Sequence, residues 1–318
     1  MTEKPAKEQA PFAALGGTGR QYLAKFLVAG PPLLFLVVFF VLPSLIMIVT
    51  SFRFPGEFGG LAPIAASERQ PAHGVEHGFT LEAYQFFFSD ILYAEIFLKS
   101  FGVAAATTLI CLVMAYPLAL LISRSKKHLR NLMVLLVVLP FASNFLIRIY
   151  AWMIILGPES GISHFINAVL DAFGIGPVTL LFSPFAVLVG MVYVHLPFMV
   201  LPLYTNLEKH DPSLLDAAQD LGATGWQRFW RVTWPLSLPG VFSGAALVFI
   251  PVLGMFAVPD ILGGTGDILI GNLIKDQFLG TRDWPFGSVL SIMLTLAVLA
   301  IAGLAAWFGR SAVGQRAA

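Results

Sequence analysis

The chain has 318 residues, of which 57% are apolar and 12% are charged, with a net charge of +1 and a mean hydropathy of +0.81. A soluble domain carries about a quarter charged residues, so this composition indicates a membrane protein. The balanced charge excludes the basic field typical of nucleic-acid binding, and the single cysteine, Cys111, excludes a disulfide framework.

Apolar stretches long enough to cross a membrane recur along the chain, since a helix needs about 20 apolar residues to cross the hydrocarbon layer. Six stretches meet this length, at about 26–51, 98–123, 131–156, 181–206, 237–258 and 286–308. The N-terminal preface is longer and more polar than a signal peptide needs, so the first stretch is expected to stay as a membrane helix. The sequence therefore predicts an all-α, polytopic protein with six transmembrane helices at 26–310, between polar tails at 1–25 and 311–318.

The basic residues predict how the chain is oriented in the membrane. An even number of spans places both termini on one side, and that side carries 13 of the 19 Lys and Arg residues. Because basic residues concentrate on the cytoplasmic side, we expect both termini and the loop at 208–236 to be cytoplasmic. The opposite side carries 12 of the 18 acidic residues. These acids either solubilise the outer loops or form an anionic vestibule that concentrates a cationic solute.

The predicted cytoplasmic loop at 208–236 has the pattern of a helical hairpin between two apolar spans. Asp211 is a favourable cap for a first helix, and Gly222 is placed to end it. The sequence from Thr224 to Gln227 fits a capping box that starts a second short helix. Pro235 is expected to end that helix before the fifth span. Such a hairpin is either a loop lying on the membrane or a docking surface for another protein.

Residues of this hairpin also match a family motif. The matching positions are Asp216, Ala217, Ala218, Gly222, Ala223, Phe229, Val232 and Pro235. They resemble the EAA loop of ABC-importer permeases, with Asp216 in place of the usual Glu and Trp234 in place of a Leu. The resemblance implies the type I ABC importer permease fold, in which this hairpin is the coupling helix that docks onto an ATPase subunit.

The same resemblance implies a larger assembly in a bacterial inner membrane. The chain has no G-x-x-x-x-G-K-[ST] phosphate-binding loop, and the dipeptide Gly-Lys is absent, so a separate subunit would hydrolyse ATP. The family implies a dimer of ATPase subunits that binds ATP and Mg²⁺, a second and different permease chain, and a solute-binding protein outside the membrane. This chain itself would bind no cofactor and carry no catalytic residue.

Two further stretches resemble the polyamine (spermidine/putrescine) branch of that family. They are Arg148-x-Tyr150-Ala151-Trp152 in the third span, and Pro259-Asp260-Ile261-Leu262-Gly263-Gly264 followed by Ile270-Gly271-Asn272. The resemblance runs from about 26 to 310 and implies import of a small organic cation by alternating access. Permeases for opines or amino-acid-like solutes share much of these motifs and are the alternative. A secondary transporter driven by an ion gradient is a less favoured alternative, because that class usually has internal repeats and none relates the two halves of the chain.

Four residues of these stretches are candidates for the substrate path. Arg148 is an ionisable residue inside a predicted span, which makes it a functional hypothesis by default. We expect it to pair with an outer-side acid, Asp260 or Glu159. Snorkelling to the interface and contact with an anionic solute are the alternatives. Tyr150 and Trp152 fit cation–π contacts to an ammonium group but also fit an aromatic belt. Asp260 fits a cation contact as well as a partner of Arg148.

Two weaker patterns concern packing. The small residues of Gly240-x-x-x-Gly244 predict a close helix contact, either within the bundle or with a partner permease. His195 lies inside the fourth predicted span and is expected to form a hydrogen bond within the bundle.

Overall fold

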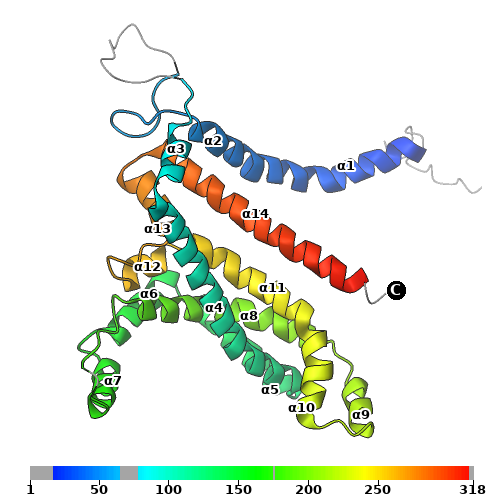
Figure 1. Ribbon diagram of the computed structural model, residues 1–318. Helices are drawn as coiled ribbons and strands as arrows, with labels where there is room; N and C mark the ends of the chain where they lie inside the picture. The colour runs from blue at the N-terminus through cyan, green and yellow to red at the C-terminus, as the bar shows by residue number, and fades with distance from the viewer. Residues whose placement is uncertain (1–16, 65–77, 175, 315–318) are drawn as a thin grey trace, which may run out of the picture.

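The computed structural model describes residues 17–64, 78–174 and 176–314 and shows a bundle of long helices (Figure 1). The α-helices are α1 (Gly17–Leu36), α2 (Leu42–Ser51), α3 (Glu82–Ser89), α4 (Ile91–Arg124), α5 (Lys127–Val138), α6 (Phe145–Leu156), α7 (Gly161–Ala172), α8 (Pro184–Leu207), α9 (Ser213–Asp220), α10 (Gly225–Arg228), α11 (Trp234–Gly254), α12 (Ala257–Leu262), α13 (Ile270–Lys275) and α14 (Trp284–Gly314). In the described part, β-structure is limited to two isolated bridges. The predicted all-α class is therefore confirmed.

Six segments of the described chain are long and apolar enough to cross a membrane, as the sequence predicts. They are Leu27–Ser51, Ile91–Arg124, Phe145–Ala172, Pro184–Leu207, Gly225–Gly254 and Trp284–Gly303. Residues 1–16 and 315–318 of the expected tails lie outside the described residues. Within the described part, α1 begins at Gly17 rather than after residue 25, and α14 continues to Gly314.

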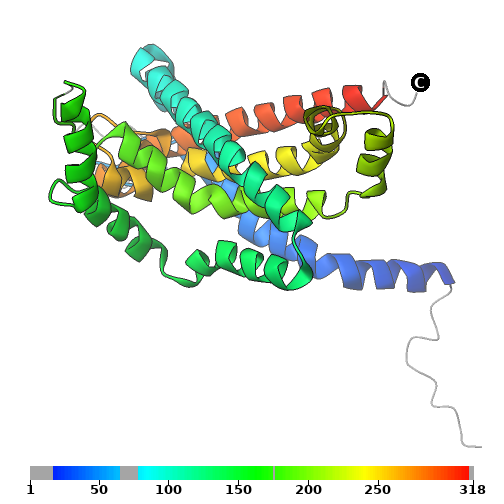
Figure 2. The same ribbon diagram turned by 90° about the horizontal axis from the view of Figure 1, so that it is seen from below.

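Helices α4, α8 and α11 form the core of the bundle (Figures 1 and 2). The glycines of the small-residue pattern lie where α11 meets α8. A Cβ atom added at Gly240 would come 2.7 Å from Cβ of Asn206, and one at Gly244 would come 2.7 Å from Sδ of Met199. The pattern is therefore a contact within the bundle. His195 of α8 is 1% exposed and pairs through Nδ1 with the Met191 carbonyl at 2.8 Å, as expected.

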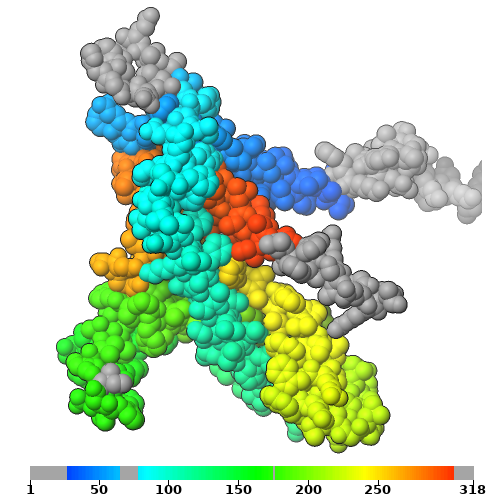
Figure 3. Space-filling model, viewed as in Figure 1, coloured from blue at the N-terminus to red at the C-terminus, as the bar shows by residue number. Residues whose placement is uncertain are grey.

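Helices α1 and α2 extend beside this core rather than into it, and Figure 3 shows the described part as a separate arm. Within Leu27–Ser51, only the last residue, Ser51, is buried by the rest of the chain. The arm packs mainly against α14, where the hydroxyls of Thr50 and Ser288 are 2.7 Å apart. The C-terminal end of α2 is also held by a hydrogen bond of 2.8 Å between the hydroxyls of Ser51 and Tyr84.

The prediction of one continuous helix over 131–156, the third span, is wrong. A 3₁₀ turn divides this stretch into α5 and α6. Pro140 lies in that turn and has no N–H to continue the hydrogen bonds of α5. Asn144 then caps α6 by accepting a hydrogen bond of 2.8 Å from the Leu146 N–H. The apolar segment of sufficient length runs instead through α6 and α7, over 145–172. Helices α5 and α6 follow one another along the bundle (Figure 2).

Two π-helical turns precede prolines that the sequence places inside helices. One joins α1 to α2 at Val37–Val41, ahead of Pro43, and the other joins α10 to α11 at Phe229–Thr233, ahead of Pro235. A widened turn lets the chain pass a proline, which lacks an N–H, without breaking the helix. The expectation that Pro235 ends the second helix of the hairpin is therefore wrong, because helical structure continues over Gly225–Gly254.

Candidate functional site

The loop at 208–236, here called the 208–236 hairpin, is shaped by local hydrogen bonds. Just before α9, Asp211 accepts a hydrogen bond from the Ser213 N–H at 2.9 Å, and this bond holds the pKa of Asp211 below its ordinary value. Gly222 has φ of +81° and ends α9, where the Gly222 and Ala223 N–H groups bond back to carbonyls of the last turn. Thr224 and Gln227 form the predicted capping box at the start of α10. The predicted helical hairpin is therefore present.

The hairpin projects from one end of the bundle (Figures 1 and 3) and exposes both charge and apolar surface. Leu214 is 46% exposed, Leu221 is 89% exposed, and Trp226 and Trp230 are 71% and 46% exposed. Of the residues in the family motif, Asp216, Ala217 and Gly222 are exposed, whereas Ala218, Ala223, Phe229 and Pro235 are partly buried. An exposed apolar surface of this kind is typical of a protein–protein contact.

A side-chain hydrogen bond that the sequence does not predict joins the two helices of the hairpin. Nη1 of Arg228 in α10 donates to Oε1 of Gln219 in α9 at 2.6 Å. The two residues are nine positions apart across a turn, so neither helical periodicity nor a capping pattern relates them. The bond helps to hold the two short helices as one unit.

Aromatic residues connect the base of the hairpin to the core. Tyr116 of α4 lies 5.5 Å from the ring of Phe229 and 5.4 Å from that of Trp234, measured between ring centroids. Its hydroxyl also hydrogen-bonds to Ser237 of α11 at 2.9 Å. Together with the unbroken helix from α10 into α11, these contacts connect the hairpin to α4 and α11.

Asp260 does not pair with Arg148, which corrects the expected ion pair. Its carboxylate contacts Nζ of Lys275 at 2.7 Å and accepts a hydrogen bond from the Asn272 side chain. Lys275 is also 3.1 Å from Asp276, and the two carboxylates, with Asp260 first, raise the pKa of Lys275. The cluster of Asp260, Lys275 and Asp276 lies on the segment between α11 and α14 and is partly exposed. A primary ammonium group is thus already bound to this carboxylate.

Arg148 is partly buried on α6 and forms no ion pair with a described residue, Glu159 included. Its guanidinium carbon lies 5.1 Å from the ring centroid of Phe141 and 5.9 Å from that of Phe145. Both rings precede Arg148 in the chain, so the side chain turns toward the start of α6. The side chain therefore turns away from the end of α6 at Leu156, which is the end nearer the predicted outer side.

Tyr150 and Trp152 lie on different faces of α6 and do not form one aromatic site. Trp152 packs against Tyr193 of α8, with ring centroids 5.5 Å apart, whereas Tyr150 is 48% exposed. Residues two positions apart in a helix point about 160° away from each other, which explains the separation. Of the four candidates for the substrate path, no two are brought together among the described contacts.

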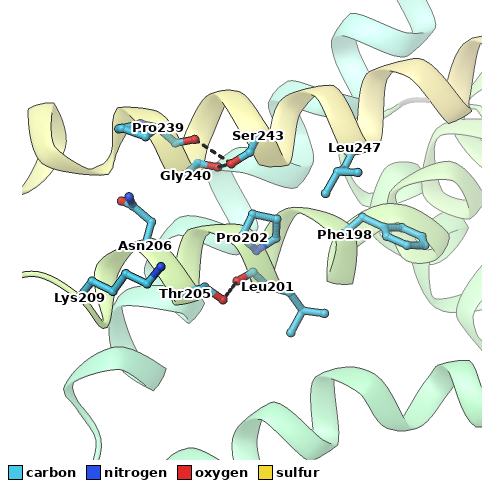
Figure 4. A pocket seen from close by; sticks show the side chains of 10 residues that line it. All are labelled: Phe198, Leu201, Pro202, Thr205, Asn206, Lys209, Pro239, Gly240, Ser243 and Leu247. Carbon is cyan, nitrogen blue, oxygen red and sulfur yellow. Dashed lines mark hydrogen bonds between the residues drawn. The ribbon is translucent and has the colours of Figure 1, made fainter. Parts of the chain in front are cut away.

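A groove of about 490 Å³ runs between α8 and α11 (Figure 4). It is lined by Phe198, Leu201, Pro202, Thr205, Asn206, Lys209, Pro239, Gly240, Ser243 and Leu247. The hydroxyls of Thr205 and Ser243 hydrogen-bond to carbonyls of their own helices, so the wall of the groove is largely apolar. Among the described residues no carboxylate lines the groove and Lys209 does, so this wall offers no charge complement to an ammonium group.

The model of the family described as "Binding-protein-dependent transport system inner membrane component" matches residues 108–312. The chain belongs to this family. The match covers the second half of α4, all of α8 and α11, the 208–236 hairpin and the segment that carries Asp260. The chain is accordingly an inner-membrane component with the permease fold of ABC importers.

Individual members of the family are similar over most of the chain. The spermidine/putrescine transport system permease protein PotB of Escherichia coli (strain K12) is 42% identical over 265 residues, which cover 83% of this chain and 90% of that protein. The protein of the same name from Haemophilus influenzae is 41% identical over 263 residues, which cover 82% and 85%. A crystal structure of a bacterial alginate ABC transporter, in complex with its alginate pentasaccharide-bound periplasmic protein, has a TM-score of 0.65 at 17% identity, covering 90% and 94%. That likeness concerns the fold.

Proposed function

We propose that this chain is the permease subunit of an ATP-driven importer of polyamines such as spermidine and putrescine. The observation that carries the proposal is the 42% identity to PotB over 83% of the chain. The 265 aligned residues include most of the transmembrane core as well as the hairpin. The acidic side opposite the basic termini suits a cationic solute, because it raises the local concentration of cations.

In this proposal the 208–236 hairpin docks onto a cytoplasmic ATPase dimer that binds ATP and Mg²⁺. Three observations support this role: the hairpin projects from the bundle, its two helices are capped and joined, and it exposes Leu221 and Trp226 beside the charge of Asp216. The position of the basic residues supports a cytoplasmic location for the hairpin and both termini. A solute-binding protein would then approach from the opposite side.

In this proposal, the helix that begins in the hairpin and ends in the core transmits the movement that drives transport. Closure of the ATPase dimer would displace α9 and α10, and the unbroken helix over Gly225–Gly254 would pass that displacement to α11. Because α11 packs closely against α8 through Gly240 and Gly244, the two helices would move together. The bundle would thereby alternate between outward and inward openings, paired with a second permease chain, in an equilibrium that the ATPase biases.

The proposed substrate path includes Asp260, with Tyr150 and Trp152 as further candidates. Arg148 would join them only for an anionic solute. Asp260 is the favoured contact for a polyamine because it already binds the primary ammonium of Lys275 at 2.7 Å. The side chain of lysine ends in the same aminobutyl group as one end of putrescine. The arriving solute would compete with Lys275 for the Asp260 carboxylate.

The proposal is tested by solute uptake into membrane vesicles that contain the complete importer. Spermidine and putrescine should be taken up with ATP, and each should compete with the other, whereas an anionic opine should not. Uptake of the opine in preference to either polyamine would contradict the proposed solute.

The coupling role is tested separately with Asp216→Lys and Gly222→Asp. Asp216→Lys reverses an exposed charge, and Gly222→Asp places a side chain where φ is +81°. Both changes should reduce co-purification of the ATPase and uptake together. Glu57→Gln, an exposed change on the other side of the predicted membrane, serves as control for expression. Full ATPase retention and uptake in both hairpin variants would contradict the coupling role.

A further inference from the structure

Asn272 of α13 holds one oxygen of the Asp260 carboxylate in place. Its side-chain amide donates to Oδ1 of Asp260 and to the Phe256 carbonyl, the latter at 3.1 Å. Its own oxygen accepts from the Leu269 N–H at 3.4 Å. Asn272 is 5% exposed, so these hydrogen bonds are shielded from water. The carboxylate is therefore oriented, and Oδ2 is the oxygen that faces the ammonium of Lys275.

The helix that carries Asn272 is capped from a distant part of the chain. Leu269 occupies the N-cap position of α13, and its side chain has no oxygen that could accept a hydrogen bond. The Ile270 N–H donates instead to the hydroxyl of Ser100 in α4 at 2.8 Å, across 170 positions of the chain. Ser100 is 2% exposed, and its hydroxyl donates in turn to the Ile96 carbonyl at 2.7 Å. This bond fixes the start of α13 to α4.

Neighbouring contacts hold the same segment against the bundle. Nζ of Lys99 in α4 donates to the Gly266 carbonyl at 2.5 Å and lies 3.3 Å from Oδ1 of Asp267. A Cβ atom added at Gly271 would come 2.8 Å from the Gly254 carbonyl oxygen, so α13 lies directly against the end of α11. The place of Asn272, and with it the direction of the carboxylate that Asn272 holds, thus depends on α4 and α11.

We propose that Asn272 and Ser100 are positioning residues for the carboxylate of Asp260. Asn272 occupies Oδ1 and directs Oδ2 toward the arriving ammonium group, and Ser100 fixes Asn272 by capping α13. The bond from the Asn272 amide remains when Lys275 gives way to the solute, so the carboxylate keeps its direction during the exchange. A group fixed in advance loses less conformational freedom on binding, which favours affinity. The inference rests on the proposed contact between Asp260 and a polyamine.

The first experiment measures initial rates of spermidine uptake, over a range of concentrations, into vesicles that contain the complete importer. Asn272→Leu removes the amide at nearly constant size, and Ser100→Ala removes the capping hydroxyl. Asn272→Leu should raise KM about ten-fold, the effect of one lost hydrogen bond to a charged group, and leave kcat near wild type. Ser100→Ala should raise KM less, and Ser100→Thr, which retains the hydroxyl, should restore it. A loss of kcat alone, with KM unchanged, would overturn the inference, because it would indicate only less folded protein.

Combination with Asp260→Asn tests whether both residues act through the carboxylate. In that background, neither Asn272→Leu nor Ser100→Ala should raise KM further. Thr108→Val is the matched control, because the Thr108 hydroxyl of α4 bonds to the Ala104 carbonyl of its own helix at 2.7 Å. This control should leave KM unchanged. Equal increases of KM with and without the Asp260 carboxylate would overturn the inference.

Hydrogen exchange in the purified importer, without solute, tests the cap itself. Ser100→Ala leaves the Ile270 N–H without its acceptor on α4 and should speed exchange over 270–275. Ser100→Thr and Thr108→Val should not. Unchanged exchange over 270–275 in Ser100→Ala would overturn the role of Ser100.

The outcomes separate this inference from the proposed function. Normal polyamine uptake with an unchanged KM in Asn272→Leu would overturn the inference alone. An unchanged KM in Asp260→Asn would overturn the inference together with the Asp260 contact, but not the import of polyamines. Absence of polyamine uptake by the wild-type importer would contradict the proposed function and the inference that rests on it.

Discussion

The two glycines at the contact of α8 and α11 should respond differently to alanine, although the sequence presents them as equivalent. At Gly240 an added Cβ would lie 2.7 Å from Cβ of Asn206, an atom fixed by the backbone of α8. Ordinary contacts begin at 3.4 Å, so the helices would have to separate by about 0.7 Å, the difference of the two distances. At Gly244 the closest atom is Sδ of Met199, which belongs to a flexible side chain, and the nearest backbone atom, the Met199 carbonyl oxygen, is 3.3 Å away.

The magnitude follows from two opposing effects. Overpacking of a close contact costs about 1–3 kcal/mol, whereas alanine favours a helix over glycine by about 1 kcal/mol. Gly240→Ala should therefore lower the free energy of unfolding by up to about 2 kcal/mol. Gly244→Ala should leave it unchanged or raise it slightly. Gly102→Ala is the control, because no atom lies within 4 Å of the added Cβ there.

The assay is thermal unfolding of the purified importer in one detergent, followed by size-exclusion chromatography of the heated samples. A difference of 1 kcal/mol corresponds to about 2–4 °C in Tm for a domain of about 150–250 residues. We expect Gly240→Ala to unfold several degrees below Gly244→Ala and Gly102→Ala. Equal or reversed midpoints for Gly240→Ala and Gly244→Ala would refute the reasoning from the Asn206 contact.

Three further predictions concern the hairpin and the proposed path. Thr224→Ala removes the capping box and should cost the hairpin about 1 kcal/mol, measured as faster hydrogen exchange over α9 and α10; unchanged exchange would contradict the role of the cap. Arg228→Met removes the hydrogen bond to Gln219 and should reduce the amount of ATPase that is retained. Gln219→Met should give the same reduction, and the double variant should reduce retention no further. Additive reductions in the double variant would show that this hydrogen bond is not the cause. Lys275→Met should lower the KM for spermidine and Asp260→Asn should raise it, because Lys275 competes with the solute for the Asp260 carboxylate. A change of KM in the same direction in both variants would contradict that competition.

The hairpin shows which structural features a local sequence pattern can predict. Asp211, Gly222 and the Thr224–Gln227 capping box were predictable because each makes hydrogen bonds to backbone groups within a few residues. The continuation past Pro235 was not, since it depends on a π-helical turn that no residue pattern specifies. The bond between Arg228 and Gln219 depends on the angle between two helices, which the intervening turn sets only in three dimensions.

The sequence by itself determined the membrane class, the number of spans and the local signals of the hairpin, because these depend on the length of apolar stretches and on short-range hydrogen bonds. Only the tertiary structure decided the charge partners: Asp260 binds Lys275, and Arg148 is left without a counterion among the described residues. It also assigned Gly240 and Gly244 to a contact inside the bundle. The physical reason is that packing between helices far apart in the chain selects the partner of a side chain. Composition and the spacing of residues along the chain do not determine that packing.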